Sequence, residues 1–83
     1  METKSQPQSE FTTKDLYLAA LLYARGLPFT KINRQGRVCW FVFENKNLCE
    51  QYQQQYFAKA VDVNAKEYTD ALRTLKDLVF ADS

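Results

Sequence analysis

The side chains that most often carry acid–base or nucleophilic chemistry are scarce in this chain of 83 residues. It contains no histidine, so no Ser–His or Cys–His pair and no imidazole metal ligand can form. The serines lie in the terminal segments, at positions 5, 9 and 83. The two glycines, Gly26 and Gly36, are too far apart to form a phosphate-binding loop. These residue types predict a protein without enzymatic activity.

The two thiols, Cys39 and Cys49, are the remaining strong nucleophiles. A structural zinc site needs four ligands, which two cysteines without histidine cannot supply. A secreted disulfide scaffold carries more cysteines and follows a signal peptide, whereas the first ten residues lack an apolar segment. We therefore expect both cysteines to be reduced and packed, with no metal or cofactor required.

The longest nearly apolar run, residues 16–24, is far too short to cross a bilayer. The shortness of this run and the expectation of reduced cysteines together predict a cytoplasmic protein without a membrane partner. No residue pattern indicates a small-molecule substrate.

One spacing resembles part of a nuclease site, namely Glu44 and Lys46 at the end of a predicted strand. Such a site needs a further carboxylate on the preceding strand to bind Mg²⁺. No aspartate or glutamate occurs between Asp15 and Glu44, and Asp15 lies near the start of a predicted helix. We interpret Glu44 and Lys46 as solvated charges at a strand end.

Charge is distributed unevenly along the chain, although the formal net charge is only +1. Residues 16–43 contain four basic residues and no acidic one. Three of the four, Lys31, Arg34 and Arg37, lie near the turn of a predicted hairpin that also carries Trp40. A basic β-ribbon with an exposed aromatic side chain can contact phosphates and stack on bases. Nucleic-acid binding through Lys31, Arg34 and Arg37 is therefore one candidate function, and its affinity would fall steeply with salt.

The predicted hairpin joins residues 29–34 to residues 37–44 through Gln35-Gly36, a two-residue turn. Its second strand is rich in β-branched and aromatic residues. Because side chains alternate along a strand, one set faces the core and the other faces away from it. The core set is Cys39, Phe41 and Phe43, and the outward set is Val38, Trp40 and Val42, which Phe29 can join from the first strand.

The outward set is apolar, and an exposed apolar patch of this kind marks an interaction site. Burial of each large side chain contributes about 1.5–3 kcal/mol. The principal functional hypothesis is that a second chain covers this face, in a homodimer or in contact with a partner protein, with Trp40 as the anchor. The alternative left open by the sequence is that Trp40 packs beneath the domain's own helices.

Three helices are predicted around the hairpin. Thr12 is the expected cap of the first, which extends through Arg25 and ends at Gly26. Because this helix is apolar nearly all round, it must be buried on most sides. The second begins at Asn45 or Asn47. The third follows a cap at residue 64 and carries an apolar stripe over residues 68–79.

Residues 60–63 form either a short third strand or an extended connection. The expected fold is α+β, with three helices packed on a hairpin in the order α-β-β-α-(short β)-α. Residues 1–10 are polar and predict a disordered tail, whereas residues 11–83 form a single domain.

Three segments resemble a family of short prokaryotic and phage domains of uncharacterised function. They are FTTKDLYLAA (residues 11–20), the strand VCWFVFE (residues 38–44) and ALRTLK (residues 71–76). The resemblance covers about seventy residues. It implies a compact module of bacteria, phages or plasmids, and it brings no catalytic residues.

Overall fold

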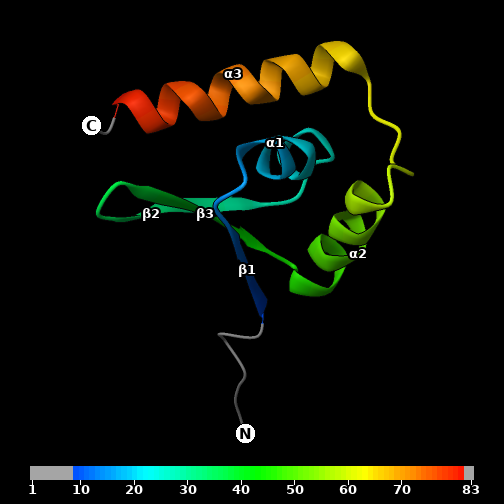
Figure 1. Ribbon diagram of the computed structural model, residues 1–83, viewed down its shortest axis with the longest axis horizontal. Helices are drawn as coiled ribbons and strands as arrows, with labels where there is room; N and C mark the ends of the chain where they lie inside the picture. Colours follow the sequence, from blue (N-terminus) through cyan, green and yellow to red (C-terminus); the bar gives the residue numbers. More distant parts are fainter. Residues whose placement is uncertain (1–8, 82–83) are drawn as a thin grey trace, which may run out of the picture.

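The computed structural model describes residues 9–81. This part of the chain contains three strands and three helices (Figure 1). In chain order they are β1 (Glu10–Thr13), α1 (Leu16–Ala24), β2 (Phe29–Gln35), β3 (Val38–Glu44), α2 (Lys46–Phe57) and α3 (Ala65–Ala81). The strands form an antiparallel sheet in the order β1-β3-β2, with β3 in the centre. The α+β class is confirmed, but the observed order is β-α-β-β-α-α.

The first difference from expectation is β1, which occupies the segment predicted to begin the first helix. Phe11 pairs with Phe43 of β3, and its side chain is buried, as is that of Thr13. The cap of α1 is Asp15 instead of Thr12. The Asp15 carboxylate accepts hydrogen bonds from the backbone N–H groups of residues 17 and 18, at 2.9 and 3.2 Å. Residues 10–13 are therefore free to pair with β3.

Residues 60–63 connect α2 to α3 without joining the sheet, so the third strand lies at the other end of the chain. Most of the predicted tail, residues 1–8, lies outside the described residues, as do residues 82–83 of the predicted domain. The end of that tail was assigned wrongly, because Glu10 belongs to β1.

The hairpin also differs in its register. Gln35 pairs with Val38, so the turn is Gly36-Arg37 instead of Gln35-Gly36. Gly36 has a φ of 62°, the left-handed conformation that a two-residue hairpin turn needs at its first position. The shift by one residue makes Arg34, not Ile32, the partner of Cys39.

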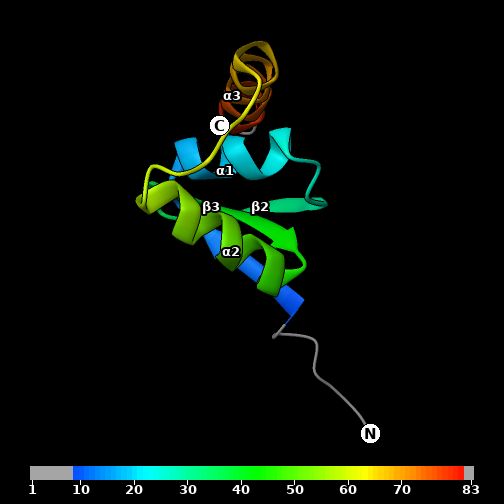
Figure 2. The same cartoon turned by 90° about the vertical axis from the view of Figure 1, so that its right-hand side faces the viewer.

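Helix α1 lies between the sheet and α3, as Figures 1 and 2 both show. Five consecutive residues, 18–22, are buried, which confirms the prediction of a central helix. The helix ends as expected at Gly26, which has a φ of 86°. The N–H groups of Gly26 and Leu27 bond back to the carbonyls of residues 23 and 22, in a Schellman motif.

Helix α2 lies beside the sheet, at the end where β3 leaves it (Figure 2). Its cap is Asn45, whose side chain accepts a hydrogen bond from the N–H of Leu48; the alternative start at Asn47 is wrong. The cap predicted for α3 at Asn64 is confirmed by a 3.0 Å hydrogen bond from the N–H of Glu67. No helix within residues 9–81 has both the length and the hydropathy to span a membrane.

The end of α2 gives a prediction about stability. Lys59 follows the helix in a left-handed conformation, with a φ of 57°, a geometry that disfavours residues with a Cβ. Lys59→Gly is expected to raise the free energy of unfolding by about 0.5–1 kcal/mol, measured by urea denaturation. The control is Ala58→Gly, because Ala58 is right-handed (φ −81°) and glycine there should destabilise the protein. A stabilising Ala58→Gly or a destabilising Lys59→Gly would contradict this reading.

Candidate functional site

The predicted interaction face is reorganised by an irregularity in β2. The register shifts between Phe29 and Lys31, so Phe29 pairs with Phe43 and turns toward the core. Its ring centroid lies 5.3 Å from that of Phe43 and 6.1 Å from that of Tyr23. The placement of Phe29 with the outward side chains was therefore wrong.

Val38, Trp40 and Val42 alternate on β3 and lie outside the core cluster. Their exposure differs: Val42 is only 2% exposed, Trp40 is half-buried and Val38 is 39% exposed. The Lys14 ammonium lies 5.9 Å from the centroid of the Trp40 ring, within range of a cation–π contact. The outward face of β3 therefore offers less uncovered apolar surface than its sequence suggests.

Arg34 joins the hairpin to the end of α3. Its guanidinium donates to the carbonyl oxygen of Val79 and, at 3.2 Å, to the Sγ of Cys39. The Val79 carbonyl belongs to the last turn of α3, where helix carbonyls lack partners within the helix and carry the negative end of the dipole. Arg34 thus holds the C-terminal turns of α3 over the hairpin.

This arrangement separates the three candidate nucleic-acid contacts. Arg34 is directed to α3, whereas Lys31 and Arg37 are exposed, one on β2 and the other in the hairpin turn. The structure does not bring the three guanidinium and ammonium groups onto one open surface.

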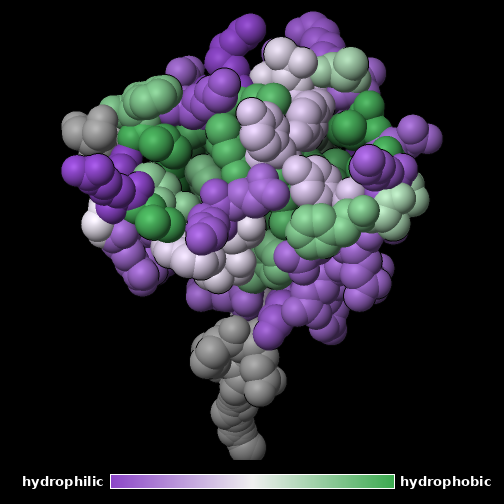
Figure 3. Space-filling view, in the orientation of Figure 1, coloured by the Kyte–Doolittle hydropathy of each residue, from purple (hydrophilic) through white to green (hydrophobic). Residues whose placement is uncertain are grey.

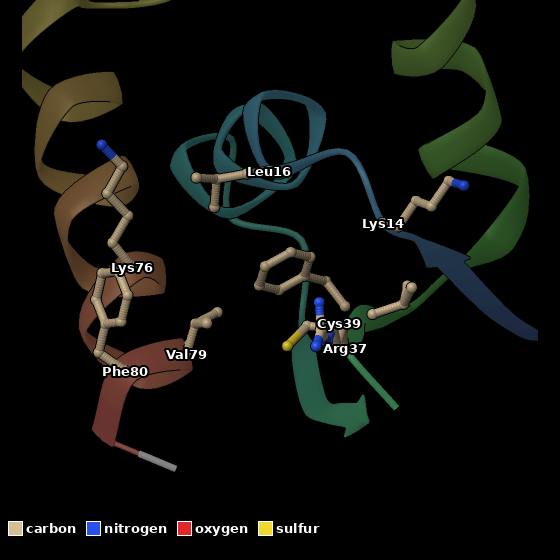
Figure 4. Close-up of a pocket in the computed structure, with 9 residues that line it drawn as sticks. Lys14, Leu16, Arg37, Cys39, Lys76, Val79 and Phe80 are labelled. Atoms are coloured by element: carbon tan, nitrogen blue, oxygen red, sulfur yellow. The ribbon is translucent and has the colours of Figure 1, made fainter. Parts of the chain in front are cut away.

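A pocket of about 510 Å³ lies between the C-terminal half of α3 and the hairpin (Figure 4). It is lined by residues from α3, the start of α1, the β1–α1 link and the hairpin: Lys14, Leu16, Arg37, Val38, Cys39, Phe41, Lys76, Val79 and Phe80. Two of these, Val38 and Arg37, are predicted site residues. Figure 3 shows hydrophobic side chains in a recess between hydrophilic ones, on the half of the molecule that holds the end of α3 and the hairpin turn.

A second pocket, of about 320 Å³, lies between the end of α3 and β2. Its lining residues are Phe29, Lys31, Ile32, Leu78 and Ala81. Because the first pocket is lined by β3 and this one by β2, the two flank the last turns of α3. We call the first pocket, between β3 and α3, the α3–hairpin groove.

Sequence reasoning missed the contribution of α3 to this groove. The predicted apolar stripe of α3 includes Leu78, which is 39% exposed in the structure, and Phe80, which lies off the stripe, is 71% exposed. The available signal was Phe80 itself, an apolar residue near the helix end that lies off the stripe. Lys14 and Lys76 gave no signal, because their proximity to the hairpin depends on tertiary packing.

The two cysteines have different environments. Cys49 is fully buried, and its thiol donates to the carbonyl oxygen of Glu44 at 3.4 Å. Burial, with a smaller effect from Glu50, raises the pKa of the Cys49 thiol to about 11. Cys39 is half-buried and lines the first pocket. Within residues 9–81, no three Cys, Asp or Glu side chains lie close enough together to hold a metal ion.

The raised pKa of Cys49 predicts a loss of stability in alkali. The ordinary thiol pKa is 9.0 and the folded one about 11, so between these values the unfolded chain releases a proton that the folded chain keeps. The stabilisation is complete below pH 9 and is lost as the pH rises to 11, a change of about 2–3 kcal/mol. Urea denaturation of wild type and Cys49→Ala at pH 7, 9 and 11 measures it. The difference in free energy of unfolding between wild type and Cys49→Ala should shrink as the pH rises. A difference that stays constant would contradict the raised pKa of Cys49.

Residues 9–81 thus define a small α+β domain with an apolar groove, between one helix end and a hairpin, that also carries basic residues. The chain belongs to the family described as Domain of unknown function (DUF5659), whose model matches residues 8–81. This match confirms the prediction of an uncharacterised domain family. No curated protein and no solved structure matches the chain.

Proposed function

We propose that this domain is a non-enzymatic binding module that contacts a partner protein through its hairpin, in the α3–hairpin groove. The observation that carries the proposal is the pocket of about 510 Å³ between β3 and α3. Its volume lies within the range of about 300–1,000 Å³ that is typical of ligand-binding pockets. Its walls come from secondary-structure elements that the core holds in place, so the site exists before a partner arrives.

Exposed apolar side chains at this end of the molecule support the proposal. Val38, Leu78 and Phe80 are each exposed by 39% or more, and each lines one of the two pockets. Apolar surface gathered around a recess provides the anchoring contacts that dominate protein–protein affinity.

The unbiased test is a selection from a random peptide library. Alkylation of Cys39 provides a way to block the first pocket. A bulky maleimide on Cys39 would fill the first pocket, whereas Cys49 is buried and should not react. We expect wild type to enrich peptides whose binding is lost after alkylation. Cys39→Ala, treated in the same way, is the control and should still bind them. Enriched peptides that bind alkylated and untreated protein equally would contradict the proposal.

A homodimer through the outward face of β3 is the second form of the binding hypothesis. Of the four residues predicted for that interface, Trp40 and Val38 still lie partly exposed on the outward face. Phe29 instead points toward the core, and Val42 is already buried. We therefore expect light scattering at micromolar concentration to give a monomer mass for wild type and for Trp40→Ala. A wild-type dimer that dissociates in a folded Trp40→Ala variant would favour the homodimer instead.

A further inference from the structure

The side chains that line the α3–hairpin groove carry charges of one sign. Lys14, Arg37 and Lys76 line the first pocket and Lys31 lines the second, and neither pocket has an acidic lining residue among residues 9–81. Two other exposed lysines are paired with an acidic residue one helical turn away, in Lys46–Glu50 and Lys66–Asp70. Lys76 has Leu72 and Phe80 at the corresponding positions. Among the described residues no ion pair involves Lys14, Arg37 or Lys76.

The basic residues surround an apolar interior. In Figure 4, Lys14 and Lys76 lie on opposite sides of the pocket with their ammonium groups at its rim, directed away from its interior, while Leu16 lies between them on α1 and Arg37 lies on the hairpin. The interior is formed by apolar side chains, including Phe41 and Val79. A complementary ligand must therefore supply apolar groups to the centre and negative charge to at least two sides.

We infer that the groove binds a segment of a partner protein in which apolar side chains are flanked by carboxylates. This inference rests on the proposed function and specifies the chemistry of the partner. A fatty acid has one carboxylate and would leave most of the basic groups unpaired. A nucleic-acid backbone supplies anions but would not fill the apolar interior.

A second copy of this chain also fits poorly. A two-fold contact places the same surface patch on both partners, so the patch that holds Lys14, Arg37 and Lys76 would face a second copy of itself. Like charges brought together across an interface oppose association. Charge complementarity therefore favours an acidic segment of a different protein.

Two synthetic peptides of fourteen residues test the inference. Both carry leucines at the same positions, and one has glutamate and the other lysine at the flanking positions. We expect the glutamate peptide to bind wild type at least tenfold more tightly at low salt, measured by fluorescence anisotropy. The double variant R37E/K76E should weaken its binding about fivefold or more and should bind the lysine peptide better than wild type does.

Arg73→Glu is the matched control, because Arg73 lies on α3, is exposed and does not line either pocket. It should change the affinity for the glutamate peptide by less than twofold. Equal affinity for the two peptides, a preference for the lysine peptide, or no binding of either would overturn the inference. So would protection of Cys39 from alkylation by oleate or by a single-stranded oligonucleotide but not by the glutamate peptide.

These outcomes are distinct from failure of the proposed function. If library selection enriches neutral or basic peptides that alkylation of Cys39 displaces, the groove is a protein-binding site and only the acidic specificity is wrong. If the selected peptides bind equally well after Cys39 is alkylated, the proposed function fails as well.

Discussion

Leu75→Ala is expected to lower the free energy of unfolding by about 2–5 kcal/mol. Leu75 is fully buried in the core cluster and belongs to α3, which packs against α1. Removal of its side chain leaves a cavity at that interface. For a small domain the loss is a large part of a total stability of about 5–15 kcal/mol. Peptide binding in the groove should weaken too, because α3 forms one wall.

The control for this prediction is Leu78→Ala on the same helix. Leu78 is 39% exposed, so its truncation should cost less than about 1 kcal/mol. Urea denaturation of the two variants, followed by circular dichroism, provides the comparison. Equal losses of stability would mean that α3 does not pack on α1 as described.

Phe43→Ala is expected to be at least as destabilising, with a loss of about 3–5 kcal/mol. Phe43 is fully buried on the central strand and is paired with Phe11 of β1 and Phe29 of β2. Its truncation removes a contact from each flanking strand and the ring contact with Phe29. Val38→Ala on the same strand is the control, with an expected loss below about 1 kcal/mol. A mild Phe43→Ala would contradict the pairing of β1 with β3, because Phe43 would then have one neighbouring strand only.

Local patterns were sufficient to predict that three helices and a hairpin occur, although the start of α1 and the register of the hairpin differ from the prediction. The run of apolar residues in α1 predicted its central position, and Gly26 and Asn64 predicted the ends of two helices. The assignment failed at β1 because residues 10–13 pair with a strand some thirty positions away, and that contact leaves little local signal. Four residues are also too few for an alternating pattern to outweigh a nearby capping residue.

The candidate site was predictable only on its hairpin side. The sequence singled out Val38 and Arg37, which line the groove, and also Phe29, whose orientation depends on the irregularity after it. Propensity does not specify such an irregularity, and one inserted residue reverses the face on which every following side chain lies. Phe80 could be noticed in the sequence as an apolar residue off the stripe, but the contribution of Lys76 could not be predicted, because it depends on how α3 packs against α1.

Methyl chemical shifts test most directly whether a partner binds in the α3–hairpin groove. The protein would be labelled at its leucine and valine methyl groups and titrated with a peptide enriched by the library selection. We expect shifts at Leu16, Val38 and Val79, with Val42 on the outward face of the sheet unchanged. Shifts centred on Val42, with Leu16 and Val79 unchanged, would contradict binding in the groove.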